Sequence, residues 1–258
     1  TVNITAAVAD VTITAAAKSG ATTGTELGIT TNEGTAIHQL MASAIASDAT
    51  VLTALNDNLT LVNSGALSVA TDLARQTAPQ TDTASGSSIA TRAMTGTVQG
   101  IVSNRMASLR SGDAYVTGMS AGNGMTAQSG FIQAFGSEAE QKNTGPATAT
   151  VYGYDSETAG VAIGFDGQTD DGSTIGLSAS FSTTDVEGKG TGKSKNAIDS
   201  YTVSVYGDKA TDYGYMEGSL TYGINDNTNS RLVNTAGLSR TYAGNYDSEQ
   251  ISLKVGGG

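Results

Sequence analysis

The sequence predicts a mainly β fold, in which a long α-helix precedes antiparallel strands that form part of a membrane β-barrel. Three observations predict it. The aromatic residues gather late in the chain, because of 10 Tyr and 4 Phe only Tyr115 precedes Phe131. An apolar stripe with helical spacing lies just before that region. The residues that follow alternate in polarity, in runs about as long as barrel strands.

The first part of the chain divides into two segments. Short alternating β-branched runs occupy residues 1–5 and 11–14 and are separated by Ala, Gly and Thr. Such runs are typical of the last coils of a β-solenoid. Apolar residues then recur every three or four positions over residues 36–76, which indicates short helices. We therefore expect a solenoid-like end over residues 1–35, and short helices with a linker over residues 36–84.

A longer helix is predicted to begin near Ser87, whose hydroxyl can cap it, and to end at Arg110. Its apolar stripe comprises Ile89, Met94, Val98, Ile101, Val102, Met106 and Leu109. Such a helix is about 35 Å long, enough to cross a membrane. Arg92, Arg105 and Arg110 project from other sides, and arginines are costly in contact with lipid. We expect residues 85–128 to contain this helix, in a polar lumen, and its connection to the first strand.

Polarity alternates with a period of two after Gly130, in about six runs roughly 9–12 residues long. The predicted strands are residues 131–136, 157–166, 173–183, 197–208, 213–224 and 246–255. In a barrel, the apolar face of each strand lies against lipid and the polar face lines the pore. The residues expected to face lipid include Leu177, Val203, Leu220 and Ile251. The residues expected to face the pore include Ser178, Ser204, Glu217 and Ser219.

A soluble β-sandwich is the alternative, because one buried face produces the same alternation. The lengths of the joins favour the barrel. Residues 167–172 and 209–212 are short joins, whereas residues 137–156, 185–196 and 225–245 are long and polar. Strict alternation of short and long joins is typical of an up-and-down membrane barrel. An aromatic girdle is expected from the tyrosines near predicted strand ends, namely Tyr201, Tyr206, Tyr213, Tyr215 and Tyr246.

Composition excludes several functions. The net charge of −11, with only 13 Lys and Arg, argues against nucleic acid, whose phosphates bind clustered cations. The chain has no cysteine, hence no disulfide or thiolate ligand. Residues 118–122 match the Gly-x-Ser-x-Gly elbow of serine hydrolases, but the only histidine, His38, lies upstream of them. We expect no enzyme activity, no metal site and no cofactor.

Short motifs follow one another in order from about Ser85 to the end of the chain. They are residues 101–112, 118–125, 130–137, 153–155, 160–166, 185–190, 198–201 and 218–223. This series resembles the C-terminal translocator β-domain of type Va autotransporters. The resemblance implies a barrel of about twelve strands with a helix in its lumen. Residues 129–258 correspond to its first half, so we expect that the chain is truncated after Gly258.

The resemblance implies a function as well. The domain is expected in the outer membrane of a Gram-negative bacterium, where it exports and anchors its own N-terminal passenger, an adhesin-like protein at the cell surface. The implied partners are outer-membrane lipid, a Sec-type export channel, periplasmic chaperones and the barrel-assembly machinery. Two alternatives stay open: a β-rich adhesin or structural protein without a transport role, and a diffusion porin.

The lumen helix carries the residues of most interest, which are Arg92, Asn104, Arg105 and Arg110. Some autotransporters release the passenger when an asparagine inside the barrel attacks its own backbone carbonyl, and Asn104 is the candidate for that reaction. The local motif around it differs from that of the self-cleaving members. We therefore expect Asn104 to be an ordinary polar residue and Arg105 to anchor the helix by pairing with a lumenal carboxylate such as Glu217.

Overall fold

The computed structural model describes most of the second half of the chain and selected segments of the first. The described residues are 21–22, 25, 31–63, 72, 76, 82–112, 127–145, 150–235 and 238–258. They fall into two compact units. The first contains the described residues up to 76 together with residues 190–194 and 230–243, and the second contains residues 82–189, 195–229 and 244–258.

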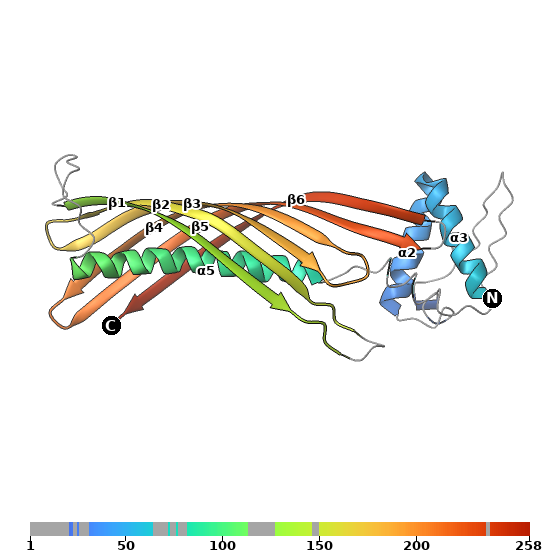
Figure 1. The fold of residues 1–258 in the computed structure, drawn as a ribbon, viewed down its shortest axis with the longest axis horizontal. Coiled ribbons are helices and arrows are strands. Elements are labelled where there is room, and N and C mark those ends of the chain that lie inside the picture. The colour runs from blue at the N-terminus through green and yellow to red at the C-terminus, as the bar shows by residue number, and fades with distance from the viewer. Residues whose placement is uncertain are drawn as a thin grey trace. The chain divides into compact units, whose positions relative to one another are not determined.

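The described residues of the first unit include helices α2 (Thr31–Ser47) and α3 (Ala49–Asn63) (Figure 1). Asp48 joins them and caps α3, since its Oδ1 accepts the N–H groups of Thr50 at 3.1 Å and Val51 at 3.2 Å. The apolar residues buried in these helices are Ile37, Val51, Leu52, Ala54 and Leu55. The β-branched runs that predicted a solenoid end, at residues 1–5 and 11–14, lie outside the described residues.

The second unit begins with helix α5 (Asp82–Ser111), 30 residues long. Asp82, not Ser87, begins it, and the Asp82 carboxylate accepts the N–H of Thr83 at 2.8 Å. The Ser87 hydroxyl lies inside the helix and donates to the carbonyl of Thr83 at 2.6 Å, so it cannot act as the cap. The helix ends at Ser111 and is followed by Gly112, whose positive φ of 82° suits a glycine. Among the described residues, no helix is long and apolar enough to cross a membrane.

A single sheet of six strands follows, and neighbours in the chain are neighbours in the sheet. The strands are β1 (Ala127–Gln141), β2 (Tyr154–Gln168), β3 (Ser173–Gly188), β4 (Lys195–Thr211), β5 (Gly214–Thr235) and β6 (Leu238–Gly257). The register is antiparallel, as in the pairs Phe131 with Gly164 and Leu177 with Val205. Strands β1 and β6 are the two edges of this sheet, and α5 lies along one of its faces (Figure 1).

The strands are longer than their polarity predicts. Residues 225–245, expected to form a polar loop, are mostly the paired ends of β5 and β6, and the long join expected at 185–196 shrinks to residues 189–194. These stretches are rich in Asn, Asp and Gly, which are poor strand formers, but cross-strand pairing overrides this local preference. Spanning a membrane takes only about 9–11 residues per strand. The strands, 15 to 22 residues long, therefore extend well beyond that thickness.

The buried face of the sheet is polar and its exposed face is apolar, which is the reverse of the pattern in a soluble protein. Ser178 is 3% exposed and Ser204 1%, whereas their neighbours Leu177 and Val203 are 54% and 50% exposed. We call the polar face under α5 the inner face and the opposite face the outer face. The exposed apolar residues of the outer face include Ile163, Phe165, Ile175, Phe181, Val205, Leu220, Tyr222, Ile224, Ile251, Leu253 and Val255. The described residues contain no second sheet against it, so the arrangement confirms the partial barrel and not the sandwich.

The expectation that Tyr206 belongs to an aromatic girdle is wrong. Its side chain is 2% exposed on the inner face and packs with Val102 and Met106 of α5. The ring lies over Gly176 of the neighbouring strand, where an added Cβ would come within 2.1 Å of the ring. Glycine at position 176 therefore makes room for a large ring between sheet and helix. Tyr213, in contrast, is fully exposed at the turn between β4 and β5.

Candidate functional site

The candidate site is the contact between α5 and the inner face of the sheet. Near its N-terminus the helix packs through Ala90 against a small apolar cluster that contains Tyr154, Val186 and Ile198. Gly86 permits this approach, because a Cβ there would lie 2.7 Å from both Tyr154 and Val186. The helix backbone therefore comes close to β2 and β3 at this end.

A second apolar cluster lies toward the C-terminus of α5 and contains Val102, Met106 and Tyr206, with Phe131 against it. The ring of Phe131 covers Gly164, its partner in the ladder, where a Cβ would come within 2.3 Å of the ring. At this end of the helix the apolar contact therefore consists of two aromatic rings, Phe131 and Tyr206, each packed over a glycine of a neighbouring strand. The remaining contacts between α5 and the inner face are made by polar side chains.

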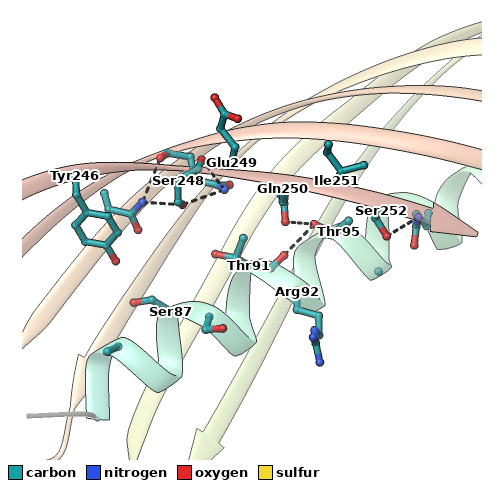
Figure 2. A pocket seen from close by; sticks show the side chains of 16 residues that line it. Ser87, Thr91, Arg92, Thr95, Tyr246, Ser248, Glu249, Gln250, Ile251 and Ser252 are labelled. Carbon is teal, nitrogen blue, oxygen red and sulfur yellow. Dashed lines mark hydrogen bonds between the residues drawn. The ribbon is translucent and has the colours of Figure 1, made fainter.

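Side-chain hydrogen bonds join α5 to strands β4 and β6 along much of the helix. Three of the four described below join two uncharged side chains, and the fourth involves a lysine. Asn196 donates to Ser87 Oγ at 2.8 Å. Thr95 Oγ1 donates to Gln250 Oε1 at 2.7 Å, Gln99 Nε2 to Ser252 Oγ at 3.0 Å, and Lys254 Nζ to Ser103 Oγ at 2.7 Å. Figure 2 shows the part of this series that includes Thr95, Gln250 and Ser252. Each strand partner lies two residues after the previous one on β6, so one face of that strand follows the helix.

Arg105 makes the first of two charged anchors. Its Nε and Nη2 bind the two oxygens of Asp166 at 2.8 and 3.0 Å, and its Nη2 also donates to Ser129 Oγ. Ser129 Oγ donates to Asp166 Oδ1 at 2.6 Å, and the hydroxyl of Tyr206 to Asp166 Oδ2 at 2.9 Å. The Asp166 side chain is fully buried. Its charge is therefore met by one guanidinium and two hydroxyls, as a buried carboxylate requires.

Arg110 makes the second charged anchor, five residues further along the helix. Its Nη1 lies 2.8 Å from Asp208 Oδ2 and 3.0 Å from Glu217 Oε2. Its guanidinium also stacks over the ring of Tyr215, 3.9 Å from the ring centre. Both charged anchors therefore belong to the last third of α5, whereas the contacts of its first two thirds are hydrogen bonds and apolar packing.

The predicted lumen residues do not all behave alike. Arg105 is an anchor, but it pairs with Asp166, and Glu217 is the partner of Arg110 instead. Arg92 is exposed on α5, and no ion pair involves it among the described residues. Asn104 is exposed too. Sequence reasoning missed several strand partners, namely Asp166, Asn196, Asp208, Gln250 and Lys254, although each sits at an inner position of the two-residue alternation.

A polar groove of about 740 Å³ runs between the first half of α5 and strands β5 and β6. Ser88, Thr91 and Arg92 line it from the helix (Figure 2). Asn225 lines it from β5, and its Oδ1 is buried with no hydrogen-bond partner among the described residues. The same holds for Gln250 Nε2 on β6. Free donors and acceptors of this kind suit contact with water or with a passing polar chain.

The wall elsewhere on the inner face consists of small hydroxyl side chains. Pairs of them join neighbouring strands, as in Ser180 with Thr202 at 2.6 Å and Ser204 with Thr221 at 2.8 Å. The predicted pore-facing residues Ser178, Ser204 and Ser219 are all buried on this face, and Glu217 lies on it as well. The described strands therefore supply a hydrophilic wall on the inner face.

An apolar outer face opposite a polar inner face that carries a helix is typical of a strand domain embedded in a membrane. Residues 130–258, half of the chain, match the family model for the autotransporter β-domain. The chain belongs to the autotransporter β-domain family, as its motifs predict, and this is a family of outer-membrane translocators rather than enzymes. No curated protein and no solved structure matches the chain.

Proposed function

We propose that this domain exports the polypeptide that precedes α5 across the outer membrane and then anchors it there, with α5 left in the lumen. The observation that carries the proposal is the set of polar contacts between α5 and the inner face. A helix with three arginines is stable inside a membrane only within a polar enclosure. The hydroxyl-rich wall offers weak contacts to an unfolded chain, and the two charged anchors hold the helix once transport is over.

The open edges of the sheet bear on this proposal. Strands β1 and β6 each have one unpaired edge among the described strands. Unpaired backbone groups in lipid cost several kcal/mol each. We propose that further strands of the same protein join β1 to β6 and close a barrel of about twelve strands, as the family resemblance implies.

The remaining parts of the proposal rest on the resemblance. A Sec-type channel delivers the unfolded chain to the periplasm, chaperones keep it unfolded there, and the barrel-assembly machinery inserts the strands. The passenger is adhesin-like, which the β-branched runs of residues 1–14 favour as the end of a repetitive solenoid. In this scheme, residues up to about 81 lie at the cell surface. Helix α5 follows them in the sequence and connects them to the strands of the membrane domain.

Proteolysis of intact cells tests export and anchoring together. The full-length protein carries an epitope tag ahead of Thr31, and cells are treated with a protease that does not cross the outer membrane. We expect the tag to be accessible and cleavage to stop before Asp82, so that α5 stays with the membrane fraction. A tag that is reached only after the outer membrane is opened would contradict export and would favour a porin. Cleavage within residues 89–109 on intact cells would contradict a helix in the lumen.

A further inference from the structure

The tip of the β5–β6 hairpin, residues 230–243, belongs to the same compact unit as helices α2 and α3. Three contacts within this unit tie the hairpin tip to the N-terminal part of the chain. Arg240 Nη1 lies 2.8 Å from Asp48 Oδ2. Arg231 Nη2 donates to the carbonyl of Gln76, and the N–H of Asn234 donates to Gln76 Oε1 at 3.3 Å. The hairpin tip thus contacts two points that lie 28 residues apart in the chain, at 48 and 76.

The carboxylate of Asp48 has two separate tasks. Oδ1 accepts the N–H groups that begin α3, and Oδ2 receives Arg240. The hydrogen bond from the N–H of Val51 lowers the pKa of Asp48, and Arg240 lowers it further. The carboxylate has this orientation only when α3 has formed, because the N–H groups that hold Oδ1 belong to its first turn. Arg240 therefore meets a feature of the folded helix and not of the unfolded chain.

The hairpin tip is itself supported. The N–H of Leu232 donates to the carbonyl of Gly192 at 2.8 Å, which links β5 to the join between β3 and β4. Leu238 is buried within the same unit. Arg240 lies over the ring of Tyr242, 5.6 Å from its centre, which limits the freedom of the guanidinium. The tip therefore presents its cation from a fixed position.

We propose that the hairpin tip is a docking surface for the folded α2–α3 segment of the same chain, and that docking holds this segment at the cell surface and opposes its return through the pore. This inference rests on the proposed export function. An exposed ion pair is weak alone, but here the two partners are parts of one chain. The contacts of Arg231 and Asn234 with Gln76 hold the same two parts together, so once one of the three contacts forms, the others form at a raised effective concentration within one chain.

Cross-linking on intact cells tests the docking. Residues 1–258 contain no cysteine, so Ala49→Cys with Thr241→Cys introduces the only two thiols of this part of the protein. A short bismaleimide joins them if the hairpin tip and the start of α3 lie together. Each single-cysteine variant controls for links between molecules. The epitope tag ahead of Thr31 reports export in the same cells.

Two charge variants separate docking from helix capping. Asp48→Asn keeps a side-chain oxygen for the cap but loses the charge, and Arg240→Gln loses the charge on the hairpin. We expect each to lower the rate of cross-linking about 2- to 5-fold, in line with an exposed ion pair. Half-molar salt should lower the unsubstituted rate similarly and leave the two variants unchanged. Lys193→Gln is the control, since Lys193 is an exposed cation of the same unit with no ion pair among the described residues.

The outcomes distinguish the two proposals. A tag at the surface without a cross-link would overturn docking and leave export standing. Equal rates for Asp48→Asn and Lys193→Gln would also overturn it. A cross-link in cells whose tag never reaches the surface would support the contact between hairpin and helix but overturn export. Loss of both the surface tag and the cross-link would overturn both.

Discussion

Arg105 of α5 and Asp166 of β2 form a two-point ion pair, with Nε–Oδ2 and Nη2–Oδ1 distances of 2.8 and 3.0 Å. Two nitrogens of one guanidinium bind the two oxygens of one carboxylate, so the pair fixes both the rotation of the helix and its position along its axis. The side chains are 12% and 0% exposed, so little water competes for either partner.

Removal of Arg105 is expected to loosen the helix. In the full-length protein, Arg105→Ala leaves the buried Asp166 carboxylate without a counter-charge, which costs about 3–5 kcal/mol. We expect a lower unfolding temperature in outer-membrane extracts, and raised ion conductance through the reconstituted domain. Arg92→Ala is the matched control, because this exposed arginine should change stability by less than about 0.5 kcal/mol. Equal effects of the two substitutions would refute the anchoring role of Arg105.

Asn104 is expected to be chemically inert. Self-cleavage requires its side-chain amide to reach the carbonyl carbon that precedes Arg105, and a helical backbone holds the two apart. Glu217, the lumenal carboxylate named from the sequence, is paired with Arg110, so it is not available to orient the amide. Asn104→Asp should therefore leave the size of the surface-attached protein unchanged on gel electrophoresis. A new N-terminus at Arg105, found by mass spectrometry and lost in Asn104→Asp, would show that cleavage occurs.

Leu177 tests the assignment of the outer face to lipid. Leu177→Arg in the full-length protein should cost about 2–4 kcal/mol if the position lies near the middle of the membrane. Leu177→Phe is the control, since it keeps an apolar side chain at the same exposed position. Denaturant unfolding of the protein in lipid vesicles measures both. Similar stability of the two variants would mean that this face is in contact with water, as on a soluble sheet.

Gly176 tests the packing of Tyr206. Gly176→Ala places a methyl group within 2.1 Å of the tyrosine ring, so the ring must move and its hydrogen bond to Asp166 is strained or lost. We expect a loss of about 1–3 kcal/mol, typical of overpacking. Gly96→Ala is the control, because no atom lies within 4 Å of an added Cβ there, and alanine favours a helix by about 0.5–1 kcal/mol. The proposed packing fails if both variants unfold at the temperature of the unsubstituted protein.

The faces of the strands were predictable because alternation fixes them independently of strand length. Leu177 and Ser178 lie on opposite faces whether the strand ends at residue 183 or at Gly188. Strand ends were not predictable, since Asn225 and Asn227 suggest a turn by composition and are instead buried on the inner face of β5. Cross-strand pairing, which the sequence pattern of one segment does not reveal, decides between the two.

The partners of the helix were less predictable than the helix itself. The stripe of Val98, Val102 and Met106 shows which side of α5 packs on the sheet, and the arginines stand out as charges in a long helix. Which carboxylate meets Arg105 depends on how far the helix is shifted along the strands. That shift is set by Gly86, Gly164 and Gly176, where aromatic or branched side chains fill the space that glycine leaves. Single-sequence patterns carry no measure of such a shift.

The distribution of contacts along α5 has a mechanical consequence for a protein that is pulled from outside the cell. Tension enters at Asp82 and first meets the apolar packing near Gly86 and the hydrogen bond between Asn196 and Ser87. Further hydrogen bonds between α5 and β6 follow before the tension reaches the ion pair of Arg105. The 23 residues from Asp82 to Asn104 can unwind from about 1.5 to about 3.4 Å per residue, which lengthens the tether by about 40 Å. Unwinding of this part of the helix would therefore absorb an applied extension. The ion pairs of Arg105 and Arg110 would bear the force only after residues 82–104 have unwound.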